Sequence, residues 1–203
     1  MTPPASARVW LVDSQAVGPD ALAGYAAWLG ASERARCTGF VRPQRRRQFI
    51  VGRALLRLAL SKLVGRAPAA IVVHERAGLA PALPDMADVG FSISHSGRWV
   101  ACAAASAVAL GLDIECVDPA RDVMALAEQA FDVAQVAALE ALAPGLRHAA
   151  FYRMWCAHEA RIKLACPSGI AYPLEAEGLA GVLASASPLA PAPVLTLVRL
   201  HEL

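Results

Sequence analysis

The sequence lacks the features of a membrane-spanning, secreted or disulfide-bonded protein. No stretch of about 18 uninterrupted apolar residues is present, so we expect no transmembrane helix. The first residues, MTPPASARVW, contain no basic segment followed by an apolar one, so we expect no signal peptide. The five cysteines are scattered and odd in number, with no CxxC pair, which argues against a cysteine-metal site and favours reduced thiols. We therefore expect a cytoplasmic location.

The chain also lacks a large net charge, but its positive charges are unevenly distributed. The formal net charge is only +2. Residues 34–66 nevertheless hold nine arginines and one lysine with no acid among them. Such a local excess of positive charge favours contact with phosphate groups. Aromatic residues are few, at 6% of the chain, and they are not interleaved with this basic stretch, which argues against a nucleic-acid stacking platform.

Hydrophobic patterning over the 203 residues predicts a mixed chain with a substantial core. Strands are expected at 8–13, 70–75, 109–117 and 193–203, with two more inside 89–106 that turn at Ser96-Gly97. Helices are expected at 19–30, 45–65, 121–143 and 147–166. This order predicts the α+β class, with helices packed on a largely antiparallel sheet.

Two acids interrupt the apolar strand ALGLDIECVD. Side chains alternate along a strand, so Asp113 and Glu115 share one face with Gly111 and lie about 7 Å apart at Cα. Like charges so placed repel unless a cation lies between them, and Mg²⁺ prefers carboxylate oxygens. The alternative is an acidic strand face turned to solvent.

A second group of polar residues lies on the predicted helix MWCAHEARIKL. Trp155, Glu159 and Lys163 recur every four residues, with His158 beside them. The spacing fits a surface Glu–Lys pair above a core tryptophan, or a metal ligand and base followed by a phosphate-binding lysine. Before it, FSISHSGRWV places Ser94 and His95 next to a turn, where an anion can bind.

Taken in order, these motifs resemble a known family. RRRQFIVGRALLR, FSISHSG, GLDIE and WCAHEARIK are similar to segments of the 4'-phosphopantetheinyl transferases of the Sfp (surfactin-activating) type, from about residue 33 to 177. The resemblance implies two similar α/β subdomains in a pseudo-twofold arrangement, here 1–107 and 108–203, in a monomer. It also implies Mg²⁺-dependent transfer of the 4'-phosphopantetheine arm of coenzyme A to a serine of an apo acyl or peptidyl carrier protein, releasing 3',5'-ADP.

The resemblance further implies roles for individual residues. Asp113, Glu115 and Glu159 are expected to bind Mg²⁺, and Glu159, His158 and Lys163 to act in catalysis. Ser94, His95 and Lys163 are expected to contact the phosphates of coenzyme A. Arg47 and Arg53, with Arg36 as a further candidate, are expected to contact its 3'-phosphate or the acidic carrier protein.

The chain departs from the family pattern at three positions. His158 stands where the family usually has lysine, Leu79 replaces the lysine of a GKP loop, and Gln135 replaces a helix-start glutamate. The alternative hypothesis is therefore a degenerate member that binds coenzyme A or carrier protein with little turnover. The intact set of three acids favours an active holo-[acyl-carrier-protein] synthase.

Overall fold

The computed structural model describes residues 5–203 and contains two sheets, each covered by one long helix. The strands are β1 (Ala7–Asp13), β2 (Val89–Ser96), β3 (Trp99–Ser106), β4 (Leu110–Cys116), β5 (Ile170–Ala176), β6 (Leu179–Ser185) and β7 (Leu195–Leu197). The helices are α1 (Pro19–Ala27), α2 (Ala31–Thr38), α3 (Pro43–Val64), α4 (Val123–Ala130), α5 (Val133–Glu140) and α6 (Pro144–Leu164). The predicted α+β class is confirmed.

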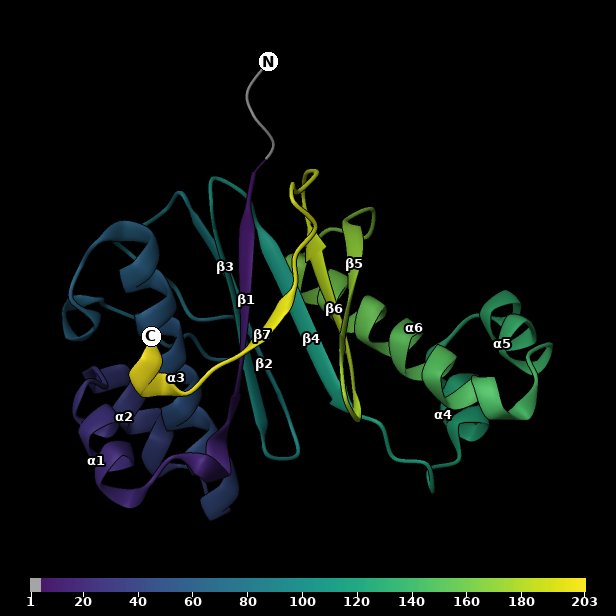
Figure 1. The fold of residues 1–203 in the computed structure, drawn as a ribbon, viewed down its shortest axis with the longest axis horizontal. Helices are drawn as coiled ribbons and strands as arrows, with labels where there is room; N and C mark the ends of the chain where they lie inside the picture. The colour runs from purple at the N-terminus through teal and green to yellow at the C-terminus, as the bar shows by residue number, and fades with distance from the viewer. Residues whose placement is uncertain (1–4) are drawn as a thin grey trace.

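The layers follow from alternation along the strands. The first sheet has the order β2-β3-β1-β7 and the second β4-β6-β5. In β1, Trp10 and Val12 pack toward α3, whereas Val9 and Leu11 pack toward the second sheet. A third apolar cluster fills the space between the second sheet and α6. The result is α3, first sheet, second sheet and α6 in succession, as Figure 1 shows from left to right.

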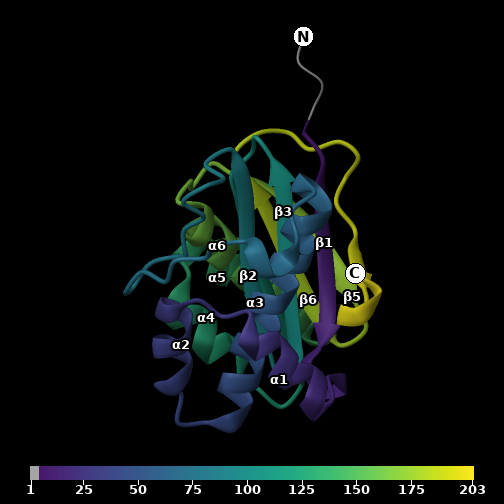
Figure 2. The ribbon, with the colours of Figure 1, turned by 90° about the vertical axis from the view of Figure 1, so that its left-hand side faces the viewer.

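Helix α3 forms the centre of the first half. Its apolar residues are buried from Phe49 to Leu60, and it ends at Gly65, which adopts a left-handed conformation with φ of 70°. Glycine meets no steric penalty there, so it closes the helix. Figure 2 looks onto α3 lying over the strands of the first sheet. No helix of the described chain is long and apolar enough to cross a lipid bilayer.

Several predicted elements need correction. Residues 70–75 are not a strand, because only one isolated bridge, His74 with Ala82, pairs this segment. The predicted helical region 121–143 consists of two helices, and the internal helix start that the sequence suggests at the capping box of Asp132 and Gln135 is confirmed as the start of the second. The strand predicted at 193–203 is confined to the three residues of β7, and a short 3-10 helix follows it at Leu200–Glu202.

The chain crosses between its halves twice. The proposed division at residues 107 and 108 falls in the loop between β3 and β4. Near its end the chain returns: β7 pairs in parallel with β1, and Leu200 enters the core beneath α3 (Figure 1). The boundaries of the two subdomains remain a prediction.

Candidate active site

The two halves meet along a seam between β2 and β4 that is built from serine hydroxyls. Alternate serines of β2 accept hydrogen bonds from alternate backbone N–H groups of β4. The three pairs are Ser92 with Leu112 at 2.9 Å, Ser94 with Ile114 at 3.2 Å and Ser96 with Cys116 at 3.0 Å. The constant offset of 20 residues means that the two strands run parallel. Each hydroxyl takes the place of a backbone carbonyl, so the seam satisfies the edge of β4.

The same serines hold the two acids of β4. Ser94 donates to Oδ1 of Asp113 at 2.9 Å, and Ser96 donates to Oε2 of Glu115 at 2.6 Å. Asp113 is only 5% exposed, and its second oxygen, Oδ2, is buried without a hydrogen-bond partner among the described residues. Burial raises the pKa of Glu115, and the charge of Asp113 adds to that rise. Both acids therefore lie in surroundings that favour an added positive charge.

Helix α6 approaches β4 closely at Gly111. A Cβ at this position would lie 2.0 Å from the carbonyl oxygen of Ala160 and 2.7 Å from the backbone nitrogen of Leu164. The approach lets Lys163 reach across the strand, where Nζ donates to Oδ1 of Asp113 at 2.7 Å. Gly111 thus does more than leave room beside the acids, because it fixes the distance between α6 and β4.

Glu159 lies one helical turn before Lys163 and is half-buried. Residues four apart on a helix share a face, so Glu159 and Lys163 form one row along α6. The described residues contain no group of three His, Cys, Asp or Glu side chains that could hold a metal ion. The structure therefore does not gather Asp113, Glu115 and Glu159 into a metal site, and their joint role stays a prediction.

A cleft of about 700 Å³ opens between α3, β2, residues 76–81 and the end of α6. Its lining includes the predicted residues Arg53, His95 and Lys163, but neither Arg47 nor Ser94. Five basic side chains and no acid line it: Arg36, Arg45, Arg53, Arg76 and Lys163. Such a lining attracts a ligand that carries several negative charges.

Comparisons with known proteins identify the family of the chain. Residues 109–178 match the 4'-phosphopantetheinyl transferase superfamily, and residues 19–107 match the N-terminal model of the 4'-phosphopantetheinyl transferases. The chain belongs to the 4'-phosphopantetheinyl transferase superfamily.

Individual relatives resemble the chain at about the same level. A 4'-phosphopantetheinyl transferase of Bacillus subtilis is 32% identical over 147 residues, covering 72% of this chain and 64% of the relative. The transferase HetI of Nostoc is 33% identical over 149 residues, covering 72% and 62%. The transferase Sfp of Bacillus subtilis is 28% identical over 151 residues, covering 74% and 66%. The matched stretch thus spans less than two thirds of each of these relatives.

Within the basic cleft, His95 contacts Arg45 and lies near enough to Lys163 for the lysine's charge to act on it. Nη1 of Arg45 is 2.8 Å from Nδ1 of His95. Burial, followed by the charge of Arg45 and with a smaller effect of Lys163, lowers the pKa of His95 to about 4. The imidazole is therefore neutral at pH 7, and it lines the same cleft as Arg45 and Lys163.

The other predicted arginines have acidic or carbonyl partners. Arg53 is buried and binds Glu75 through Nε at 2.7 Å, with Glu33 at 3.5 Å. Arg47 donates to the backbone oxygens of Ser14 and Val17, at 3.1 and 2.6 Å, which ties β1's end to α3. Arg53 thus contributes a neutralised cation to the cleft wall, and Arg47 joins two segments outside it.

Sequence reasoning missed several residues of this site. Arg45 and Arg76 line the cleft, and Gln48 fixes Arg45 by accepting its hydrogen bond at 2.9 Å. The spacing of Ser92, Ser94 and Ser96 was the available signal for the seam, because hydroxyls at alternate strand positions share one face. The last predicted residue, His158, is exposed on α6.

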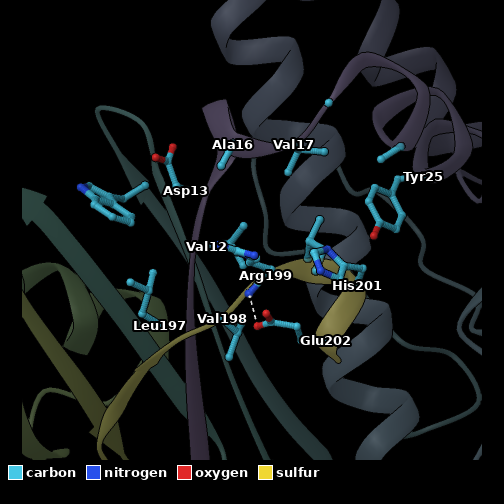
Figure 3. A pocket seen from close by; sticks show the side chains of 14 residues that line it. Val12, Asp13, Ala16, Val17, Tyr25, Leu197, Val198, Arg199, His201 and Glu202 are labelled. Atoms are coloured by element: carbon cyan, nitrogen blue, oxygen red, sulfur yellow. Dashed lines mark hydrogen bonds between the residues drawn. The ribbon is translucent and has the colours of Figure 1, made fainter.

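A second cavity, of about 590 Å³, lies away from these residues. It is enclosed by the end of β1, by α1 and by residues 197–202 near the C-terminus. Figure 3 shows Val12, Val17 and Tyr25 facing this C-terminal segment. Its lining contains none of the predicted site residues and is mostly apolar, so the basic cleft remains the candidate active site.

Proposed function

We propose that the protein transfers the 4'-phosphopantetheine arm of coenzyme A to a serine hydroxyl of an apo acyl or peptidyl carrier protein, releasing 3',5'-ADP. One observation carries the proposal: a cleft lined by five basic residues and no acid extends to Lys163, which binds the buried Asp113. Membership of the superfamily supports it, as does the match of both halves of the chain. Within the superfamily we favour the Sfp type, acting as a monomer in the cytoplasm.

The reaction moves one phosphoryl group. The serine oxygen of the carrier bonds to the phosphorus that bears pantetheine, and the bond from this phosphorus to the bridging oxygen breaks. The electron pair leaves with 3',5'-ADP, and the serine proton passes to a base, for which Glu159 is the candidate on α6. Catalysis of this kind depends on positioning and on neutralising charge. Lys163 supplies positive charge at the cleft. His158, on the exposed side of α6, can donate a further hydrogen bond to a phosphate oxygen.

We propose that the acids of β4 bind a magnesium ion. Asp113 offers a buried carboxylate oxygen that has no partner among the described residues, and Glu115 follows it on the same face of β4. Hard carboxylate oxygens are the protein ligands that Mg²⁺ prefers. We assign Asp113 and Glu115 to it, with Glu159 as the third acid from α6. When bound, Mg²⁺ would neutralise negative charge on the pyrophosphate.

The alternative is a member of the superfamily that binds coenzyme A or the carrier with little turnover. The ion pair between Lys163 and Asp113 favours this alternative, since it uses one carboxylate oxygen that a metal would need. The free second oxygen of Asp113 and the nearby Glu115 favour the active enzyme. Turnover therefore decides between the two.

The test is to incubate the protein with coenzyme A, Mg²⁺ and an apo carrier protein and to weigh the carrier by mass spectrometry. We expect a gain of one phosphopantetheine. Asp113→Asn removes one charge from the site and should lower kcat/KM about 10²- to 10³-fold, as loss of a key electrostatic group does. Asp85→Asn removes the same charge from an exposed loop and should leave the rate unchanged.

Each result has a definite meaning. Coenzyme A binding without any gain of mass by several carriers supports the alternative. Loss of folding in Asp113→Asn, seen by circular dichroism, would show that this acid is structural. Full activity of the folded Asp113→Asn variant would remove Asp113 from the site.

A further inference from the structure

A third cavity, of about 480 Å³, opens between the start of α2, the middle of α3 and residues 69–75. Of the described residues, none lines both this cavity and either the basic cleft or the cavity near the C-terminus. Its walls are apolar where Trp28, Ile71 and Val73 line it, and polar where α2 begins. A cavity of this size, with apolar walls and a few polar groups, is typical of a small-molecule site.

One donor at this cavity lacks an acceptor. Arg57 is 1% exposed, and its two terminal nitrogens bind the carboxylate of Glu33, with Nη1 at 2.9 Å from Oε1. Its Nε is buried and has no hydrogen-bond partner among residues 5–203. A buried N–H without an acceptor destabilises the fold, and an acceptor bound beside it would remove that cost. Because Arg57 lines the cavity, a ligand bound there can supply the acceptor.

The start of α2 brings further donors to the same cavity. Gly30, Ala31 and Ser32 line it, and Gly30, the N-cap residue, has no side chain to accept the first N–H groups of the helix. Those groups have no acceptor within the helix, and the helix dipole gives them partial positive charge. The hydroxyl of Ser32 accepts the N–H of Glu75 at 3.2 Å, so its own proton can be donated to a ligand.

The charges around the cavity favour a ligand with one negative charge. Glu33 is paired with Arg57. Glu75, the acid of the lining, is bound by both Arg36 and Arg53. Three arginines thus share two carboxylates, and the cluster keeps an excess of one positive charge. A single carboxylate would balance this excess, since charge-assisted hydrogen bonds from Arg and from a helix start are strong.

We propose that this cavity binds a small monocarboxylate with an apolar body. The carboxylate accepts hydrogen bonds from Nε of Arg57 and from the start of α2, and the body lies against Trp28 and Ile71. Inorganic phosphate fits less well, because it would bring a second charge beside Glu75 and leave the apolar walls uncovered. The site involves neither coenzyme A nor a carrier protein, so the inference goes beyond the proposed function and does not depend on it.

The test is a titration of the ¹⁵N-labelled protein, followed by amide chemical shifts, with three probes. Hexanoate carries both the charge and the apolar body, acetate carries only the charge, and hexanol carries only the body. Hexanoate should shift the amide signals of residues 31–33 saturably, with a Kd of about 1 mM. Acetate and hexanol should each bind at least about tenfold more weakly, because each lacks one of the two contributions.

The protein contains its own control, and two variants sharpen the result. Asp132 caps the start of α5, so hexanoate should leave the amides of that turn unshifted. Ser32→Ala removes one donor and should weaken hexanoate binding about 3- to 10-fold, the range for one hydrogen bond. Ser168→Ala removes a hydroxyl from an exposed turn and should leave the Kd unchanged. Ser32→Asp places a carboxylate of the chain itself at the start of α2, so it should abolish hexanoate binding while raising Tm.

The results that would overturn the inference are distinct. The cavity is not a carboxylate site if about 20 mM hexanoate produces no saturable shift at residues 31–33, since binding at the expected Kd would then be nearly complete. Equal affinities for hexanoate and hexanol would mean that the charge is not recognised, and equal affinities for hexanoate and acetate would mean the same of the apolar body. Shifts confined to His95 and Lys163 would place the carboxylate in the basic cleft instead. None of these outcomes affects the proposed transfer of phosphopantetheine.

Discussion

Replacing Gly111 by alanine should separate the two elements that bear the proposed catalytic groups. The added Cβ would lie 2.0 Å from the carbonyl oxygen of Ala160 and 2.7 Å from the backbone nitrogen of Leu164. Contacts of a Cβ below 3.0 Å are essentially never found, so one element must move by at least 3.0 − 2.0 = 1.0 Å. Both clashing atoms belong to the backbone of α6, where they form one helical hydrogen bond, so no side-chain rotation relieves the clash.

The displacement has two expected costs. Overpacking of a well-packed core usually costs 1–3 kcal/mol, and a backbone clash belongs at the upper end, so we expect about 3 kcal/mol. For a chain of this size that corresponds to a fall in Tm of about 6–12 °C. A shift of about 1 Å between Lys163 on α6 and Asp113 on β4 should also lower the transfer rate about 10²-fold.

The assay pairs a thermal melt with the carrier-modification rate at a temperature where the variant is folded. Gly145→Ala is the matched control, because Gly145 lies on the same helix and a Cβ there meets nothing within 4 Å. The control should keep its rate and gain up to about 1 kcal/mol from helix propensity. If Gly111→Ala melts and turns over like the wild type, then the close approach of α6 to β4 does not position the site.

Three further predictions concern stability. Glu33→Gln should lower the free energy of unfolding by about 3–5 kcal/mol, measured in urea, because it leaves Arg57 buried without its charged partner; a loss below about 1 kcal/mol would contradict this. His95 has a pKa near 4 in the folded protein and near 6.5 in the unfolded chain, so it destabilises the fold as the pH falls through that window. Between pH 7 and 5 the free energy of unfolding of the wild type should fall by about 1–2 kcal/mol more than that of His95→Gln. Equal losses would refute this assignment of the His95 pKa. Ser92→Ala should cost about 1–3 kcal/mol, because the buried N–H of Leu112 loses its acceptor, and a neutral result would mean that the seam contributes little.

Elements with strong periodicity were predictable from the sequence. Helices α3 and α6 and the strands β2, β3 and β4 appear close to where apolar spacing, Gly65 and the Ser96-Gly97 turn place them. These signals are local, since each depends on residues within one or two turns. The α+β class followed from them.

Elements whose identity depends on distant partners were not predictable. The segment 70–75 has strand-like residues, and Ile71 and Val73 are indeed buried, but no neighbouring strand lies alongside to complete a ladder. Conversely, β6 is buried on both faces and its sequence shows no alternation of apolar and polar residues, so its hairpin with β5 was not predicted. Its one local signal was Gly178, whose φ of 70° suits the turn between the two strands.

The candidate site divides in the same way. The sequence pointed to Asp113 and Glu115 because acids inside an apolar strand are unusual, whereas the roles of His95 and Lys163 came from the family resemblance. It could not rank the arginines of α3, since rank depends on which guanidinium groups find partners after folding. Arg53 is neutralised by Glu75, from a loop more than 20 residues away, whereas Arg45 is not. Charge pairing across the fold, rather than local pattern, decides which cation remains available to a ligand.

The position of the site follows from how the two halves are joined. Ser94 accepts the N–H of Ile114, which fixes β4 against β2, and the same hydroxyl donates to Asp113. The contact between β2 and β4 and the orientation of Asp113 therefore both depend on the hydroxyl oxygen of Ser94. A slip of β4 by one residue would turn its acids to the opposite face. The basic residues lie mostly on the first half of the chain and the acids on the second. Only the two halves packed together can therefore present basic and acidic groups to one pyrophosphate. Separated halves, expressed as two chains, should therefore regain transfer activity only in proportion to their reassociation.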